Sequence, residues 1–224
     1  MIKTVFIDID NTVLCFYKCA ERALRVAFAR NGIEFKDEYL PKFFKINDKL
    51  WRMVEEGVLT REEVHEIRLR LVFKELGING DARKTEGYFL EEIEKTAEPV
   101  SGAKELLIYL SSKYKVYAAS NSIYTRQVAR LKRADFYKYF SGVIVSDLVG
   151  ANKPSKEFFN YCLNTAQTPA VNCVMIGDSL HADIFGAKNV GMTTIWYNHL
   201  KIDGLNSNDY DYYVESLLDI KKIL

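Results

Sequence analysis

Two aspartates near the N-terminus have the types and spacing that catalysis on a charged substrate would use. Asp8 and Asp10 lie in or just after the run of residues 5–9, whose β-branched and aromatic side chains predict a strand buried on both faces. Side chains alternate along a strand, so both carboxylates should point to the same side. Two carboxylates held that close either raise the pKa of one of them or require a cation. The alternative is ordinary turn chemistry, because Asp10, Asn11 and Thr12 can all bond their own backbone.

Three more groups of polar residues lie just after predicted strands or just before a predicted helix. They are Ser120 with Asn121 after a strand over 115–119, Lys153 before a helix capped by Ser155, and Asp178 with Asp183 after a strand over 173–176. Because the carboxyl ends of parallel strands meet at one edge of an open sheet, we expect these groups to share a crevice with the N-terminal aspartates. Together they would supply a nucleophile, a proton donor, ligands for a divalent cation and donors for phosphoryl oxygens. Those are the requirements of phosphoryl transfer to a carboxylate.

Each of these residues also has a purely structural explanation. Lys153 could be a solvated loop lysine, and Ser120 could simply cap the next helix. Asp178 could be a turn residue after a glycine, and Asp183 a first-turn acid that the helix dipole favours. The joint occurrence of the four groups is what favours the catalytic interpretation.

The elements that position these groups fall into two blocks. Helical periodicity fills residues 15–98, where Thr60-Arg-Glu-Glu63 forms a capping box and Asp81 caps a further helix. From Pro99 onward the chain alternates helix and strand, beginning with a helix that Ser101 is expected to cap. We therefore predict an α/β protein with a Rossmann-like parallel-sheet core over 1–14 and 99–224, and an all-helical cap domain inserted over 15–98.

The composition limits which kinds of partner and which cellular compartment we expect for this protein. The chain has 224 residues, with 31 basic and 30 acidic side chains and a formal net charge of +1, so neither a nucleic-acid polymer nor a membrane is expected as a partner. The apolar runs are shorter than the roughly 20 residues that a membrane-spanning helix needs. The first residues lack the pattern of a signal peptide, so we expect a cytoplasmic protein. The four cysteines have no metal-binding spacing and are expected to be free thiols.

The four groups of polar residues resemble the four motifs of the haloacid dehalogenase (HAD) superfamily, in the same order. Asp8-Ile-Asp10-Asn-Thr12 is similar to the first motif and Ser120-Asn121 to the second. Lys153-Pro154 is similar to the third, and Gly177-Asp178-Ser-Leu-His-Ala-Asp183 to the fourth. The matches span the whole predicted core, and jointly they are specific although each alone would be weak.

This resemblance implies a role for each motif residue. Asp8 would be the nucleophile that forms an aspartyl-phosphate, and Asp10 would protonate the leaving oxygen and then activate water. Ser120, Asn121 and Lys153 would bind the phosphoryl group. Magnesium would be ligated by Asp8, Asp178 and the backbone carbonyl of Asp10, with Thr12, Ser179 and Asp183 supporting these ligands at one remove.

The cap resembles a narrower branch of the superfamily. Ile46-Asn-Asp-Lys-Leu-Trp51, followed by Glu56-Gly57 and the capping box, is similar to the cap of bacterial pyrimidine 5'-nucleotidases, and N-acylneuraminate-9-phosphatases have a related sequence. The resemblance implies a phosphatase that acts on a small phosphorylated metabolite, with nucleoside 5'-monophosphates as first-choice substrates. We expect the protein to be a monomer or a homodimer. The alternatives to this function are a phosphatase of sugar phosphates or of N-acylneuraminate 9-phosphate, and a regulatory protein on the same fold without turnover. Phe16 and Tyr17 follow the first motif as a linker into the cap, so we expect them to contact the leaving group.

Overall fold

The computed structural model describes residues 1–202 and 208–224, which form two compact units. The core unit comprises Met1–Cys15 and Ala97–Leu224, and the helical unit comprises Phe16–Thr96. Each unit has its own buried apolar cluster, as expected of separate domains. Within the described residues, no helix combines the length and apolarity needed to cross a bilayer.

A six-stranded sheet, parallel throughout, forms the centre of the core unit, which confirms the predicted fold class. Its strands are β1 (Thr4–Ile7), β2 (Lys115–Ser120), β3 (Gly142–Val145), β4 (Cys173–Gly177), β5 (Thr193–Tyr197) and β6 (Tyr212–Val214). The spatial order is β3-β2-β1-β4-β5-β6, so β1 lies between β2 and β4. All four residues of β1 are buried, because a central parallel strand is covered on both faces.

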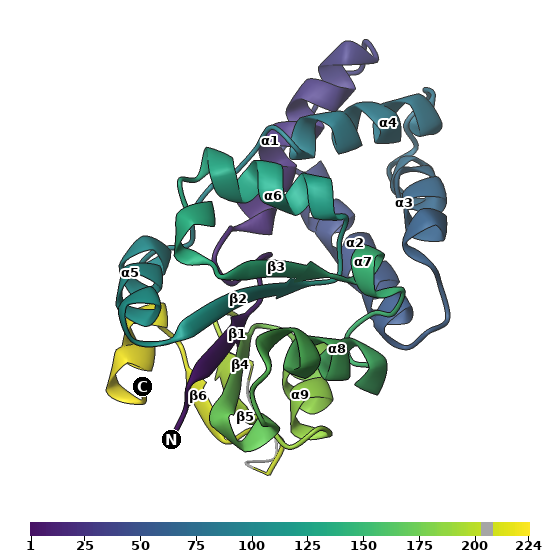
Figure 1. The fold of residues 1–224 in the computed structure, drawn as a ribbon. Coiled ribbons are helices and arrows are strands. Elements are labelled where there is room, and N and C mark those ends of the chain that lie inside the picture. Colours follow the sequence, from purple (N-terminus) through teal and green to yellow (C-terminus); the bar gives the residue numbers. More distant parts are fainter. Residues whose placement is uncertain (203–207) are drawn as a thin grey trace. The chain divides into compact units, whose positions relative to one another are not determined.

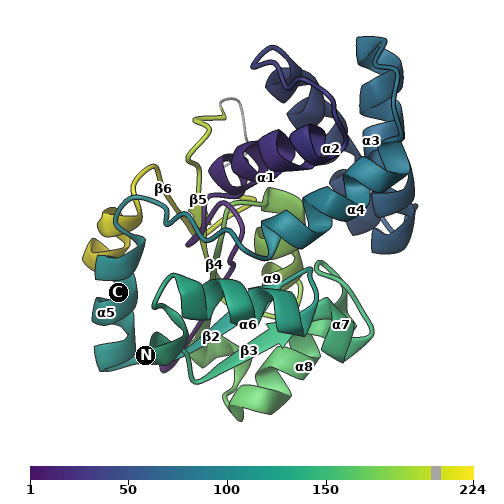
Figure 2. The same ribbon diagram turned by 90° about the horizontal axis from the view of Figure 1, so that it is seen from above.

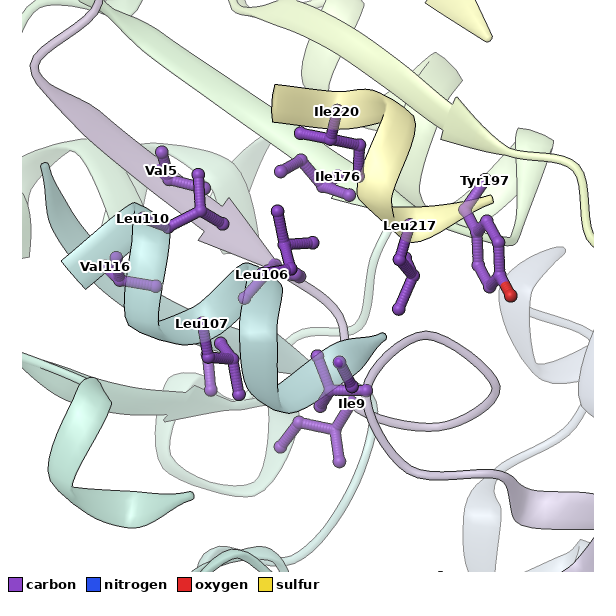
Figure 3. Packing of buried hydrophobic residues seen from close by; sticks show 14 of the residues in the cluster. Val5, Ile9, Leu106, Leu107, Leu110, Val116, Ile176, Tyr197, Leu217 and Ile220 are labelled. Carbon is purple, nitrogen blue, oxygen red and sulfur yellow. The ribbon is translucent and has the colours of Figure 1, made fainter. Parts of the chain in front are cut away.

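Helices cover both faces of this sheet (Figure 1). One face packs against α5 (Ala103–Lys113), α6 (Tyr124–Arg133) and the C-terminal turn η4 (Leu217–Lys222), and Figure 3 shows Leu110 of α5 beside Val5 of β1. The opposite face packs against α8 (Lys156–Ala166) and α9 (Gly186–Lys188). The shorter elements are η1 (Tyr137–Tyr139), α7 (Ser146–Val149), η2 (Ala170–Asn172) and the π-helical turn η3 (Leu180–Phe185).

The helical unit contains α1 (Phe16–Arg30), α2 (Tyr39–Glu55), α3 (Arg61–Leu76) and α4 (Ala82–Ile93). Helix α1 packs on α4, and α2 packs on α3 (Figure 2). The predicted capping box is present, because the Thr60 side chain accepts from the Glu63 amide while the Glu63 carboxylate accepts from the Thr60 amide. Asp81 caps α4 by accepting from the Lys84 amide.

Two local predictions were wrong. Ser101 does not cap α5, because Gly102 occupies the N-cap with a φ of 79°, a left-handed conformation that glycine adopts without steric cost. Phe16 and Tyr17 do not form a linker, because α1 already begins at Phe16. Cys19 and Ala20, about one turn further on, are already buried on the apolar face of this helix.

Candidate active site

The predicted polar groups of the core unit meet at the carboxyl end of the sheet. Asp8 directly follows β1, Ser120 ends β2, and Asp178 directly follows β4. These strands are neighbours, and the chain leaves β1 towards β2 on one side but leaves β4 towards β5 on the other. An open α/β sheet binds its ligands at such a switch point. The sheet order therefore gathers residues that lie more than 100 positions apart in the sequence.

Lys153 lies at the centre of this group. Its Nζ donates to Asp8 Oδ1 at 2.6 Å, to Asp183 Oδ1 at 2.6 Å and to the carbonyl oxygen of Ala119 at 2.8 Å. The lysine is only 2% exposed, so it is not the solvated loop residue of the alternative interpretation. Asn121 fixes the loop that carries it, because its side chain donates to the Lys153 carbonyl and accepts from the Lys153 amide. In this structure Asn121 therefore positions the lysine.

The charges of this cluster do not balance. Burial raises the pKa of Asp8 well above its ordinary value; Lys153 opposes this shift, whereas Asp183, Asp178 and Asp10 add to it. Burial likewise raises the pKa of Asp183. Burial alone would lower the pKa of Lys153, but Asp183 and Asp8 raise it above its ordinary value, so the lysine is charged. One ammonium group cannot neutralise the surrounding carboxylates.

A divalent cation fits this imbalance. Oxygen atoms of Asp8, Asp178 and Asp183 lie within 4.8 Å of one another, and carboxylate oxygens are the donors that magnesium prefers. Both oxygens of Asp183 already accept hydrogen bonds, from Lys153 and from the Ser179 amide at 3.1 Å. These bonds are consistent with the supporting role expected of Asp183 and leave Asp8 and Asp178 as the better-placed carboxylates.

Three residues lie close to the carboxylates of Asp178 and Asp183, namely Thr12, His199 and Gly177. The Thr12 hydroxyl donates to Asp178 Oδ1 at 3.5 Å, and its supporting role towards the metal ligands stays a prediction. His199 Nε2 lies 3.6 Å from Asp178 Oδ2, a contact that the sequence does not predict. A Cβ at Gly177 would lie 2.1 Å from Asp183 Oδ2, so glycine is what lets this carboxylate reach the strand end.

Two residues of α6 that the sequence analysis missed hold the carboxylate of Asp10. Arg130 Nη1 donates to Asp10 Oδ1 at 2.7 Å, and Gln127 Nε2 donates to Asp10 Oδ2 at 2.7 Å. One signal for Gln127 is visible in the sequence, because it lies four residues after Ile123 and four before Leu131, on the buried face of the helix. A polar residue in that register needs a buried partner.

The backbone after Asp10 turns sharply at Asn11. Its φ is 58°, in the left-handed region where asparagine is the most tolerated residue after glycine. Asparagine can therefore occupy this turn at little steric cost.

Phe16 and Tyr17 belong to the helical unit, and both are partly buried there. The Tyr17 ring packs edge-on against Phe44 with centroids 4.8 Å apart, and its hydroxyl donates to Asp48 Oδ2 at 3.5 Å. Phe16 packs against the buried cluster that α1, α2, α3 and α4 share. Both rings therefore have packing partners in their own unit, and their predicted contact with a leaving group stays a prediction.

Similarity to known proteins extends over most of the chain. Residues 2–191 match a family model described as haloacid dehalogenase-like hydrolase. The HAD-hydrolase YfnB of Bacillus subtilis is 33% identical over 88% of this chain and 84% of its own length. Its crystal structure, which is bound to magnesium and reveals interdomain movement, superposes with a TM-score of 0.93 at 31% identity, covering 100% of this chain and 98% of that chain.

Two further relatives have named activities. The pyrimidine 5'-nucleotidase PynA of Streptococcus pneumoniae is 30% identical over 97% of this chain and 93% of its own length. A glyceraldehyde 3-phosphate phosphatase of Pyrococcus abyssi is 28% identical over 90% of this chain and 83% of its own length. The family that the four motifs resemble is thereby confirmed.

Proposed function

The chain belongs to the haloacid dehalogenase-like hydrolase family and is one of its phosphatases, and we propose that it is a magnesium-dependent hydrolase of nucleoside 5'-monophosphates. One observation carries the proposal: a buried aspartate, Asp8, held by Lys153 beside the carboxylates of Asp178 and Asp183. A charged cluster of this kind is costly to bury unless it serves a ligand.

The proposed reaction has two steps, both at Asp8. First, a carboxylate oxygen of Asp8 attacks phosphorus, the bond from phosphorus to the ester oxygen breaks, and Asp10 gives its proton to that leaving oxygen. Second, Asp10 takes a proton from a water molecule whose oxygen attacks phosphorus, so that the acyl-phosphate bond breaks and inorganic phosphate leaves. Asp10 regains in the second step the proton that it lost in the first.

The other residues bind and orient the phosphoryl group. Lys153 offers a fixed positive charge, and the hydroxyl of Ser120 a hydrogen-bond donor, to phosphoryl oxygens. Magnesium, held by Asp8, Asp178 and the Asp10 carbonyl, would supply charge neutralisation when bound. Thr12, Ser179 and Asp183 orient these groups.

Similarity to a pyrimidine 5'-nucleotidase over nearly the whole chain supports nucleoside 5'-monophosphates as substrates. Similarity to a glyceraldehyde 3-phosphate phosphatase supports the second candidate, a sugar-phosphate or related phosphatase. The two candidates share the same chemistry at Asp8 and differ only in the leaving group.

Phosphate release separates these possibilities. The purified protein is assayed with a panel of nucleoside 5'-monophosphates, sugar phosphates and N-acylneuraminate 9-phosphate, each at one concentration, with magnesium or with EDTA. We expect the highest kcat/KM on a pyrimidine nucleoside monophosphate and none with EDTA. Asp8→Asn should abolish turnover, because an amide is no nucleophile, and retained turnover in that variant would refute the covalent mechanism.

The place of Phe16 and Tyr17 is tested by replacing both with alanine. If the rings stack on a nucleobase, nucleotide kcat/KM should fall by about 10-fold or more while acetyl phosphate turnover changes much less. Phe35→Ala, which removes a partly buried ring elsewhere in the helical unit, is the control for lost packing. A parallel loss on both substrates would show that the two rings only pack the helix.

A further inference from the structure

Asp10 is held by two side chains of α6, a helix that carries none of the four family motifs. Arg130 and Gln127 are one turn apart on α6, and both are fully or almost fully buried, at 2% and 0% exposed. The Asp10 side chain is 32% exposed. A buried pair of polar residues therefore supports a carboxylate that solvent and substrate can still reach.

The hydrogen-bond chemistry permits only one arrangement of this network. An ionised carboxylate can only accept and a guanidinium can only donate, so the Gln127 amide must turn its nitrogen to Asp10 and its oxygen to Arg130. These are the observed contacts: Gln127 Nε2 to Asp10 Oδ2 at 2.7 Å, and Arg130 Nη1 to Gln127 Oε1 at 3.0 Å. Arg130 Nη1 also donates to Asp10 Oδ1 at 2.7 Å, which closes the ring of bonds.

The network also reaches the phosphoryl-binding hydroxyl. Gln127 Nε2 donates to Ser120 Oγ at 3.0 Å, so one amide group bonds both Asp10 and Ser120. The Ser120 hydroxyl accepts this bond and therefore directs its own proton elsewhere. One side chain of α6 thus sets the positions of two groups that come from different strand ends.

We propose that Arg130 and Gln127 are positioning residues that orient the Asp10 carboxylate for proton transfer, a role that rests on the proposed function of Asp10. Each carboxylate oxygen has about two lone-pair sites, and the network takes one site on each oxygen. When Asp10 carries a proton, that proton must lie on a remaining site. The two bonds thereby restrict where the acidic O–H can point.

This role predicts a dependence on the leaving group. The alkoxide that leaves a nucleoside 5'-monophosphate needs a proton as the ester bond breaks, whereas p-nitrophenolate leaves readily without one. Loss of orientation at Asp10 should therefore slow alkyl esters selectively. A general loss of structure would slow both esters together.

The experiment compares kcat/KM on these two esters for Arg130→Met, Arg130→Lys and Gln127→Leu. The substrates are p-nitrophenyl phosphate and whichever nucleoside 5'-monophosphate the wild-type protein turns over. Arg130→Met should lower kcat/KM on the nucleotide by about 10- to 100-fold, the usual effect of a lost hydrogen bond to a charged group, and on p-nitrophenyl phosphate by less than about threefold. Arg130→Lys, which keeps a charged donor, should recover part of the loss. Arg133→Met, on an exposed position of the same helix, is the matched control and should behave as wild type on both esters.

A second set of variants keeps the test decisive even if Arg130→Met folds poorly. In an Asp10→Asn background, Arg130→Met should cause no further loss on the nucleotide, because a residue that acts through Asp10 has nothing left to orient. An additional loss in that background, or equal losses on both esters in the Asp10-containing protein, would overturn the proposal. Failure of the proposed function is distinguishable, because Asp8→Asn would then keep its activity whatever happens at Arg130.

Discussion

Each unit of the molecule buries a charged cluster, and the two clusters differ in their balance. In the helical unit, Arg68 Nη2 lies 2.5 Å from Glu86 Oε1, and Arg68 Nη1 donates to Asn47 Oδ1 at 2.8 Å. The guanidinium also lies over the ring of Phe89, 4.6 Å from its centroid. In the core unit, a single lysine faces Asp8 and Asp183, with Asp178 beside them.

The difference in charge balance between the two clusters indicates which of them has a functional role. One cation facing one anion, with an amide and aromatic rings around them, is a satisfied network that connects three helices. One cation facing several anions is incomplete and draws in a further positive charge. The imbalance, rather than burial itself, distinguishes the candidate active site from the structural pair.

Replacing Lys153 should have the largest effect on kcat, whereas replacing Arg68 should have almost none. Lys153→Met should lower kcat by about 10²- to 10³-fold or more, because a fixed donor to the reacting group is lost. Arg68→Met should leave kcat within about threefold at a temperature where the variant is folded, because the structural pair holds no reacting group. Steady-state assays at 20 °C, after circular dichroism confirms folding, make the comparison. Near-normal turnover by Lys153→Met would contradict it.

Removing the arginine should cost stability without removing a group from the candidate active site. Arg68→Met leaves Glu86 buried without its cation, which destabilises by about 3 to 5 kcal/mol in comparable pairs. Replacing both partners, as Arg68→Met with Glu86→Leu, should recover most of that loss because apolar groups then fill the site. Urea unfolding curves of the wild type and these two variants measure the difference. A double variant as unstable as the single one would show that the pair itself is required.

Magnesium should stabilise the protein, and more so at higher pH. The raised pKa values of Asp8 and Asp183 mean that the metal-free fold loses stability as pH rises from the ordinary carboxyl value of 3.8 through the raised ones. A cation displaces those protons, so it binds best where the carboxyls are already ionised. At about 100 times its Kd, magnesium should contribute about 2.7 kcal/mol, or roughly 5 to 10 °C in Tm for a chain of this size.

Scanning calorimetry at pH 5 and pH 8, with magnesium or EDTA, measures this shift. Asp178→Asn, which removes one carboxylate from the group, should reduce it. Arg68→Met should keep the full shift, because that cluster has no excess of negative charge. An equal shift at both pH values would contradict the linkage to Asp8 and Asp183.

Thiol reactivity gives the smallest expected effect. Burial raises the pKa of Cys162 to about 12 although Lys153 opposes the shift, and burial raises the pKa of Cys173 to about 11. Both should stay protonated and resist iodoacetamide at pH 8, whereas Cys15, which is partly exposed, should react first. Mass spectrometry of the alkylated native protein tests the order. Fast labelling of Cys162 would contradict this order and would show that Lys153 stabilises the Cys162 thiolate more than burial destabilises it.

The sequence alone determined the features that local chemistry controls. Apolar runs predicted the strands, and the caps at Thr60, Asp81 and Ser155 predicted where helices begin, since each such signal depends on residues a few positions apart. The order of the four motifs predicted the family. Asp8 and Lys153 are 145 positions apart, yet the order of the motifs was enough to place both in one predicted site.

The tertiary structure decided the pairings that no local pattern encodes. Periodicity can place Gln127 on the buried face of α6, but only the order of β1 and β2 in the sheet brings that face to Asp10, 117 positions away. Helical spacing likewise does not indicate that Arg68 meets Glu86 from a different helix. A hydrogen bond depends on distances of a few tenths of an ångström, which periodicity along one element cannot fix and the packing of several elements does.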